Sequence, residues 1–267
     1  MRVNGLVQKM HTSLKDGIAQ YFLKMNDHEI NMNDLIGKNI SLTFTNNILC
    51  SNCGQYTKKS YSQGHCYLCS QQLASCDLCI MKPETCHFHL GTCREPEWGE
   101  NNCFTPHIIY LANSSGAKVG ITRMTNVPSR WIDQGAIQAL PILQVDSRIK
   151  SGMIESSLKQ YINDKTNWRQ MLKNEVDLID LSKIRDELIP KIADLIENTS
   201  AEMVDSVNYD ISYPVIEYPT KIVSLNFDKT PNIEGIVKGI KGQYLILDIG
   251  VLNIRKFSSY ELEMAVN

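Results

Sequence analysis

Apolar and polar residues alternate in three short runs near the start of the chain. These runs cover residues 5–10, 19–25 and 39–44 and contain β-branched and aromatic residues. Alternation with a period of two predicts strands that bury one face. We therefore expect an N-terminal β segment over residues 1–47.

A similar pattern returns near the other end of the chain. Residues 235–240 echo the first run, residues 242–248 echo the second, and residues 251–257 predict a further strand. The connector before them, 206–233, contains three prolines and predicts edge strands at most. We expect this C-terminal segment, 206–267, to pair with the N-terminal segment in a small sheet or barrel, with the middle of the chain inserted between them.

A helical period appears in residues 182–199. Apolar residues recur at positions 184, 188, 192, 195 and 196, which is the spacing of one helix face, and Pro190 interrupts the helix. We interpret residues 176–205 as a helical connector that contributes packing alone.

Residues 106–175 predict a small α/β module. Alternating runs at 107–112 and 117–122 surround a polar turn that ends in glycine, which is typical of a hairpin. Pro128 lies near the first turn of a short helix over 129–135. A longer amphipathic helix is expected over 151–162, with Ile154, Leu158, Tyr161 and Ile162 facing inward and Glu155 beside that apolar stripe.

The composition is that of a globular protein with a packed core. Of the 267 residues, 43% are hydrophobic and 21% are charged, and the formal charge is −2. This charge argues against binding to nucleic acid by bulk electrostatics, although a local basic patch remains compatible with it. The first residues lack the apolar region of a signal peptide, and no apolar run approaches the roughly 20 residues that span a bilayer. We expect a cytoplasmic protein without a membrane partner.

All nine cysteines lie between residues 50 and 103. In a long chain without an export signal, such clustering favours thiolate metal ligands over disulfides. The spacing Cys50-x2-Cys53-x12-Cys66-x2-Cys69 predicts two tight knuckles that surround one structural zinc ion, and Gly54 allows the first knuckle to turn. An iron–sulfur cluster and a redox dithiol are the competing interpretations. This Cys-rich module spans residues 48–105.

A second zinc site is expected behind the first. Cys76 and Cys79 have the spacing of a third knuckle, and we favour Cys93 and Cys103 as the other two ligands. Cys86 and His89 are the alternatives, and any cysteine left over would be a small buried hydrophobe. Closed sites with four ligands stabilise a fold and leave no position for water, so the one or two zinc ions are expected to be structural.

The α/β module resembles the GIY-YIG nuclease superfamily over about 70 residues. Ile108-Ile109-Tyr110 stands where that family has its first tripeptide, and Lys118-Val119-Gly120 where it has the second. Arg130 matches the arginine of the first helix, Glu155 the metal-binding glutamate, and Asn167 a late asparagine of some members. The sequence around the cysteines and the hairpin also resembles a bacterial domain-of-unknown-function family. This second resemblance implies no activity.

The first resemblance implies metal-dependent cleavage of DNA or RNA. Tyr110 would be the base or its relay, Glu155 the ligand of Mg²⁺ or Mn²⁺, and Arg130 the clamp on the phosphate. The chain departs from the family at two places, because Lys118 replaces the second tyrosine and Gln134 replaces a helix tyrosine or histidine. Catalysis would then rest on Tyr110, Lys118, Arg130, Glu155 and Asn167.

Each of these residues also has a purely structural interpretation. Tyr110 fits a core strand, Arg130 fits an ion pair with Asp133 or Glu155, and Asn167 fits a helix cap. Residues 106–175 carry nine Lys and Arg against five acids, a net charge of +4 that favours a nucleic-acid surface.

The sequence thus predicts an α+β fold with terminal β segments, a zinc module and a GIY-YIG-like module. The leading function is nucleic-acid binding with metal-dependent cleavage. The alternatives are a non-catalytic zinc module that binds nucleic acid or a protein partner, and a zinc-handling protein.

Overall fold

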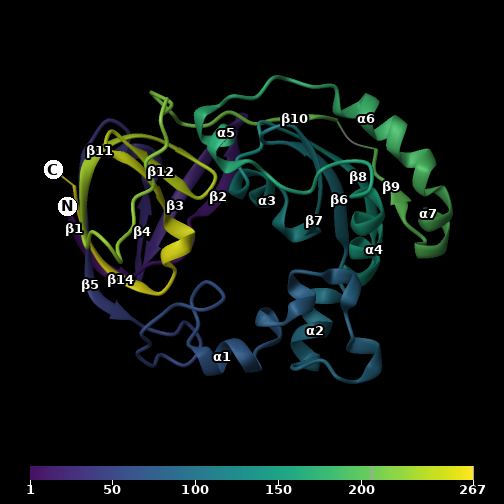
Figure 1. Ribbon diagram of the computed structural model, residues 1–267, viewed down its shortest axis with the longest axis horizontal. Coiled ribbons are helices and arrows are strands. Elements are labelled where there is room, and N and C mark those ends of the chain that lie inside the picture. The colour runs from purple at the N-terminus through teal and green to yellow at the C-terminus, as the bar shows by residue number, and fades with distance from the viewer. Residues whose placement is uncertain (206, 267) are drawn as a thin grey trace.

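The two ends of the chain pair with each other in the computed structural model, which describes residues 1–205 and 207–266 (Figure 1). Strand β14 lies between β1 and β5, and the six-stranded sheet has the order β1-β14-β5-β11-β12-β13. A second sheet has the order β2-β3-β4. We call these two sheets the β module. Its strands are β1 (Arg2–Leu6), β2 (His11–Lys15), β3 (Ile18–Met25), β4 (His28–Asn31), β5 (Asn39–Ile48), β11 (Asn232–Lys241), β12 (Tyr244–Leu247), β13 (Gly250–Asn253) and β14 (Tyr260–Val266).

Alternating burial explains why these segments form strands. In β3, Tyr21 and Leu23 are fully buried, while Gln20 and Phe22, which alternate with them, are partly exposed. In β14, Leu262 and Met264 are buried in the same core. The sequence prediction that the two ends share a sheet is therefore confirmed by the register of β1, β14 and β5.

A further antiparallel sheet, of five strands, forms what we call the sheet module. Its order is β10-β8-β6-β7, with β9 also paired to β8. The strands are β6 (His107–Asn113), β7 (Ala117–Arg123), β8 (Gln138–Val145), β9 (Glu202–Met203) and β10 (Tyr209–Asp210). The helices are α3 (Ser129–Asp133), α4 (Arg148–Leu158), α5 (Trp168–Lys173), α6 (Leu181–Leu188) and α7 (Ala193–Thr199). Antiparallel sheets with helices grouped around one of them fit the predicted α+β class.

The two faces of this sheet pack against different partners. Ile109 and Leu111 of β6 belong to a core that includes Ile154 of α4 and Leu181 of α6. Tyr110 on the opposite face belongs to the core that also fills the β module, together with Trp131 of α3. The sheet module therefore packs against the β module through the face that carries Tyr110.

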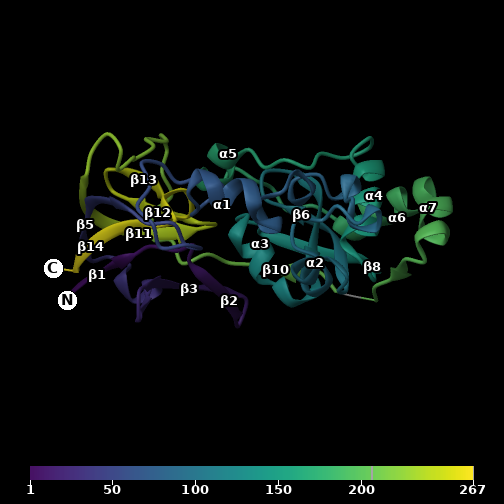
Figure 2. The ribbon, with the colours of Figure 1, turned by 90° about the horizontal axis from the view of Figure 1, so that it is seen from below.

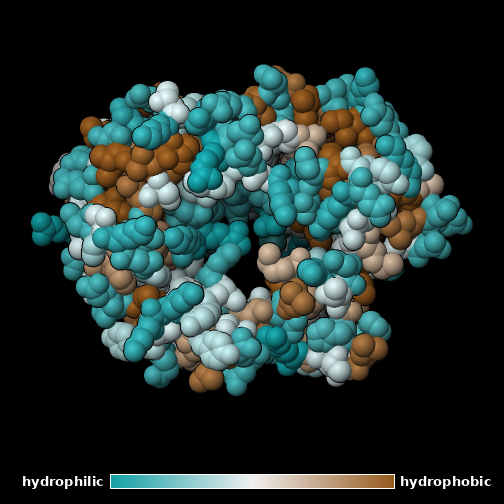
Figure 3. Space-filling model, in the orientation of Figure 1, coloured by the Kyte–Doolittle hydropathy of each residue, from teal (hydrophilic) through white to brown (hydrophobic). Residues whose placement is uncertain are grey.

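The Cys-rich segment connects the two modules along one side of the molecule (Figures 1 and 2). It contains α1 (Tyr67–Gln72), α2 (Pro96–Cys103) and several short 3-10 turns. The space-filling view shows a hollow near the middle of the molecule, which the two modules and this segment surround (Figure 3).

Helix boundaries differ from the predictions at α4. The helix expected over 151–162 spans Arg148–Leu158. Tyr161 lies beyond its end and is 49% exposed, so its predicted inward position is wrong. The chain turns there because the carbonyl of Asn163 accepts the backbone N–H of Val119 in β7 at 2.8 Å. The interruption predicted at Pro190 is confirmed, since a 3-10 turn, Ile189–Ile192, separates α6 from α7.

The last predicted strand is also corrected. Residues 251–257 form β13 only as far as Asn253 and continue as a 3-10 turn, Ile254–Phe257. Residues 206 and 267 of the predicted C-terminal segment lie outside the described residues. Within the described part of the chain, no helix has both the length and the hydrophobicity needed to cross a bilayer.

Candidate functional site

Four cysteines converge at the tip of the segment that follows β5. The sulfur atoms of Cys50, Cys53, Cys66 and Cys69 all lie within 4.8 Å of one another, and those of Cys53 and Cys66 are 3.9 Å apart. Zinc–sulfur bonds of about 2.3 Å place the corners of a tetrahedron about 3.8 Å apart. The cluster is therefore compatible with one structural zinc ion in a zinc ribbon.

Local backbone structure brings the two pairs together. Gly54 has a φ of +70°, and its N–H donates to the carbonyl of Cys50 at 2.9 Å, which closes the first knuckle. Cys66 is the N-cap of α1, and its sulfur accepts the N–H of Cys69 at 3.5 Å. Asn52 donates to the sulfur of Cys69 at 3.4 Å. These contacts come from residues close in the sequence, through the backbone and the side chain of Asn52.

The four thiols differ in acidity. Burial acts to raise the pKa of Cys50, but hydrogen bonds from the backbone N–H groups of Cys53 and Cys66 lower that pKa to about 5. A hydrogen bond from Asn52 acts to lower the pKa of Cys69, yet burial and the neighbouring cysteines raise it overall. Cys50 thus loses its proton readily, whereas Cys69 holds its proton more strongly than a free thiol. A zinc ion would bind all four cysteines as thiolates, so its binding should release the protons that remain on these thiols.

The other cysteines lie between α1 and α4. Cys79, Cys86, Cys93 and Cys103 line a cavity of about 20 Å³ together with His87. The sulfur of Cys76, which the spacing predicted as a ligand beside Cys79, contacts the hydroxyl of Ser75 at 3.9 Å. His89 is exposed. The second ligand set stays a prediction at this point.

Tyr110 and Lys118 meet at the end of α3. The two residues lie on one face of the β6–β7 hairpin, where Tyr110 pairs with Gly120 and Lys118 pairs with Ala112. Tyr110 donates to Oε1 of Gln134 at 3.2 Å, and Nζ of Lys118 donates to the same oxygen at 2.5 Å. A Cβ atom added to Gly120 would lie 2.6 Å from the Tyr110 hydroxyl, so the tyrosine ring requires glycine on the neighbouring strand.

Burial changes the acidity of both groups. Tyr110 is fully buried, which raises its pKa, while the nearby charge of Arg130 acts to lower it. Burial, with a contribution from Arg130, lowers the pKa of Lys118 to about 7. A second hydrogen bond joins Nζ of Lys118 to the hydroxyl of Thr166 at 2.7 Å. Lys118 is therefore a buried amine that can lose its proton near neutral pH.

Glu155 lies close to the same group. Burial raises its pKa, and Lys159, one helical turn later, acts to lower it through an ion pair of 3.2 Å. Lys159 also contacts Asp164 at 3.3 Å. The charge of Glu155 acts on the pKa values of both Tyr110 and Lys118. The charge of Arg130 thus acts on the pKa values of this carboxyl, of the amine and of the phenol.

Asn167 has a different environment. It is the N-cap of α5, and its side-chain oxygen accepts the N–H groups of Arg169 and Gln170 at 3.2 and 3.4 Å. The residue is exposed, and its own N–H donates to the hydroxyl of Ser115 at 2.8 Å. The observed contacts are those of a helix cap.

A family model described as "protein of unknown function (DUF2797)" matches residues 37–262. The chain belongs to the DUF2797 family. The match covers the cysteine tetrad and the whole sheet module of this DUF2797 protein. Searches of curated proteins and of solved structures gave no significant match.

Sequence reasoning did not find every polar partner in this DUF2797 chain. Gln134 appeared in the sequence only as a departure from a family pattern, yet its oxygen joins Tyr110 to Lys118. Thr166 was not singled out, because a lone threonine before a helix has no distinguishing spacing. Lys159 forms an ion pair with Glu155. The spacing of these two residues, i and i+4 on a helix, is the signal in the sequence that predicts this contact.

Proposed function

We propose that this protein binds nucleic acid on a zinc-stabilised scaffold and cleaves phosphodiester bonds with the help of Mg²⁺ or Mn²⁺. The observation that carries the proposal is the grouping of Tyr110, Lys118, Arg130 and Glu155 beside Gln134. These residues come from two strands and two helices in the order that resembles the GIY-YIG nuclease superfamily. The order of the β6–β7 hairpin, α3 and α4 along the chain supports this proposal.

Arg130 and Glu155 are the groups that would contact the phosphate and the metal ion. Both are partly exposed, whereas Tyr110 is completely buried. A guanidinium offers paired donors to a phosphate, and a carboxylate is a preferred ligand of Mg²⁺. Lys159 pairs with Glu155 and also with Asp164, so it has a second carboxylate to contact when Glu155 binds a metal ion.

Lys118 is the proton acceptor in this proposal. With a pKa of about 7 it is neutral in a large fraction of molecules at physiological pH, which suits a general base. The oxygen of a water molecule bonds to phosphorus and its proton passes to Lys118, while the old P–O bond breaks and its electrons stay on the leaving oxygen. Tyr110 and Gln134 orient Lys118. A metal ion bound at Glu155 would supply stabilisation of the leaving oxygen.

Local charge supports a polyanionic substrate. Residues 106–175 have a net charge of +4 within a chain of −2. Arg255, in the 3-10 turn after β13, adds a further positive charge, and its pKa is lowered by burial and by the charge of Arg130. Lys and Arg grouped near one site attract phosphates at long range.

One observation favours the alternative of a non-catalytic module that binds nucleic acid or a protein partner. The hydroxyl of Tyr110 is bonded to Gln134 in the core, and Glu155 is already paired with Lys159. A fold that has kept the hairpin while losing its reaction would retain these same contacts.

The experiment compares wild type with Glu155→Ala on labelled single-stranded, duplex, branched and RNA oligonucleotides with Mg²⁺ or Mn²⁺. We expect cleavage by wild type, at least 100-fold less by Glu155→Ala, and similar binding by both. Glu175→Ala removes another ion-paired glutamate of the same module and serves as the control. Tight binding without cleavage would select the non-catalytic module, and the absence of binding would refute both nucleic-acid functions.

A further inference from the structure

A second group of cysteines surrounds a cavity that is the size of a single ion. Cys79 lies in a 3-10 turn, Cys86 ends the next turn, Cys93 follows in a loop, and Cys103 ends α2. Their cavity has a volume of about 20 Å³. A single water molecule needs at least about 10–15 Å³, so this space holds one small species. We propose that Cys79, Cys86, Cys93 and Cys103 bind a second structural zinc ion as thiolates.

The four thiols line one cavity and interact electrostatically, whereas the ligand atoms in this region that lie within 4.8 Å of one another belong to Asp77, Cys79 and His87. Cys79 interacts electrostatically with Cys86 and Cys103, and Cys103 interacts with Cys86 and Cys93. All four are free cysteines. Cys86 takes the place that the spacing had suggested for Cys76, which does not line the cavity. The four cysteines follow one another at intervals of 7 to 10 residues in the sequence. Helix α2 places Cys103 at the same cavity as the turns and loop that carry the other three.

Arg148 places a buried positive charge near Cys79 and Cys103, and such a charge needs a negative partner. Arg148 at the start of α4 donates to the carbonyl of Ile80 at 2.6 Å, and its charge acts on Cys79 and Cys103. Among the described residues, the buried Nε atom of Arg148 has no hydrogen-bond partner. A buried guanidinium beside four neutral thiols would be an uncompensated charge, which is costly. Zinc with four thiolates carries a net charge of −2 and supplies the compensation.

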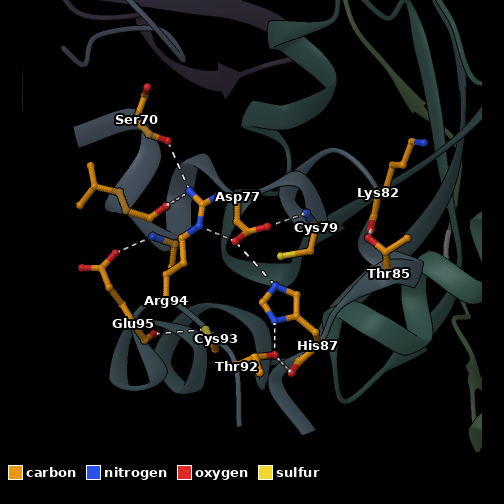
Figure 4. A network of polar contacts seen from close by, with 12 residues as sticks. Ser70, Asp77, Cys79, Lys82, Thr85, His87, Thr92, Cys93, Arg94 and Glu95 are labelled. Carbon is orange, nitrogen blue, oxygen red and sulfur yellow. Dashed lines mark hydrogen bonds and ion pairs between the residues drawn. The ribbon is translucent and has the colours of Figure 1, made fainter. Parts of the chain in front are cut away.

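A polar network supports the loop that carries Cys79 (Figure 4). Asp77 accepts Nε of Arg94 at 2.7 Å and the N–H of Cys79 at 3.4 Å. His87 lies between Asp77, at 3.6 Å from its Nε2, and Thr92, at 2.7 Å from its Nδ1. Because both ring nitrogens of His87 face polar partners, we assign it to the support of the site. Its nitrogen nevertheless lies within 4.8 Å of the sulfur of Cys79, so a histidine ligand is the outcome that the experiment must exclude.

The second ion would also position α4, which carries Glu155. Gly152 of α4 packs directly on Pro83 and Glu84, between Cys79 and Cys86, and a Cβ atom there would lie 2.6 Å from the backbone nitrogen of Glu84. The zinc-bound turns thus form a platform for the helix. The existence of the site does not depend on the proposed cleavage reaction.

The test counts zinc per chain by elemental analysis of purified protein. We expect two ions in wild type and one each in Cys79→Ser and Cys86→Ser. Cys76→Ser is the matched control and should keep two, because Cys76 lies outside both ligand sets. One ion in wild type, or loss of an ion from Cys76→Ser but not from Cys86→Ser, would overturn the proposal.

X-ray absorption at the zinc edge of wild type gives an answer even if the variants do not fold. Four sulfurs per zinc at about 2.3 Å are expected, because both sites then contain only thiolates. A contribution from imidazole would assign a ligand role to His87 and contradict the proposed set. His87→Gln should keep both ions.

Discussion

At the scale of single residues, the side-chain oxygen of Gln134 is the centre of the candidate site. It accepts hydrogen bonds from the phenol of Tyr110 and from the amine of Lys118, and both donors are buried. The pKa of Lys118 falls to about 7 because burial and Arg130 disfavour its charged form. The charge state of one buried amine therefore changes within the physiological range.

We predict that the cleavage rate follows the deprotonation of Lys118. Below pH 7 most molecules carry the charged amine, so the rate should fall about tenfold for each pH unit and should level off above pH 7. Single-turnover rates between pH 5.5 and 9 measure this dependence. Lys118→Met should lose the dependence and most of the rate, whereas Lys165→Ala, which removes an exposed lysine, should keep both. A wild-type rate independent of pH would assign the base elsewhere.

The cluster of Cys50, Cys53, Cys66 and Cys69 could be predicted from residue spacing because both of its knuckles are local. Two Cys-x2-Cys pairs need only a turn and a helix start to bring their sulfurs together. The role of Gln134 could not be predicted in this way. Its partners are fixed by the packing of α3 on the hairpin, and no spacing in the sequence encodes that packing.

At the scale of elements, α4 is held between the sheet and the Cys-rich turns. Ile154 and Leu158 pack into the core of the sheet module, and Gly152 contacts Pro83 and Glu84 on the other side. The sequence predicted this helix three residues too late. Its amphipathic stripe begins at Ile154, whereas Ser151 and Gly152 are buried, and Gly152 packs against the Cys-rich segment, a contact that the periodicity of α4 cannot reveal.

Replacing the helix glycine tests this contact. Gly152→Ala would stabilise an exposed helix by about 1 kcal/mol, but here the new Cβ atom would meet the backbone of Glu84. We expect a loss of about 1–3 kcal/mol in the free energy of unfolding by urea, together with weaker retention of one zinc ion. Ser156→Ala, an exposed position of the same helix, should stay within about 0.5 kcal/mol of wild type. Increased stability of Gly152→Ala would show that α4 is not docked there.

The strand β14 shows where pattern reading failed for an element. Tyr260, Leu262 and Met264 alternate with exposed or partly exposed residues, as a strand requires. The prediction nevertheless ended at residue 257, because the 3-10 turn Ile254–Phe257 was included in the previous strand. The pairing of the chain ends was still found, since the repeat between residues 5–10 and 235–240 pointed to it.

At the scale of the whole molecule, the β module holds α3 against the sheet. Asp133 of α3 contacts Lys9 at 2.8 Å and accepts a hydrogen bond from Gln243 at 2.8 Å. Gln243 also donates to the carbonyl of Met10 at 3.0 Å. Residues from both ends of the chain thus fix the helix that carries Arg130 and Gln134. The β module, the sheet module and the Cys-rich segment act together in shaping one site.

We predict that Asp133→Ala weakens both stability and the site. The side chain of Gln243 would keep a buried donor without its partner, which costs about 1–3 kcal/mol, and α3 would lose its link to Lys9. Urea unfolding measures the first effect, and a lower cleavage rate measures the second. Asp146→Ala removes an exposed ion pair with Lys150 and should change stability by less than about 1 kcal/mol. Equal effects of the two substitutions would contradict the coupling between the modules.

The most direct test of the account is whether Glu155 binds a catalytic metal ion. Mn²⁺ binding is measured by electron paramagnetic resonance with zinc-loaded protein and a single-stranded oligonucleotide, in wild type and Glu155→Gln. We expect one bound Mn²⁺ per chain in wild type, none in Glu155→Gln, and the same zinc content in both. Equal Mn²⁺ binding by the two proteins, or none by either, would contradict a metal-dependent site at Glu155.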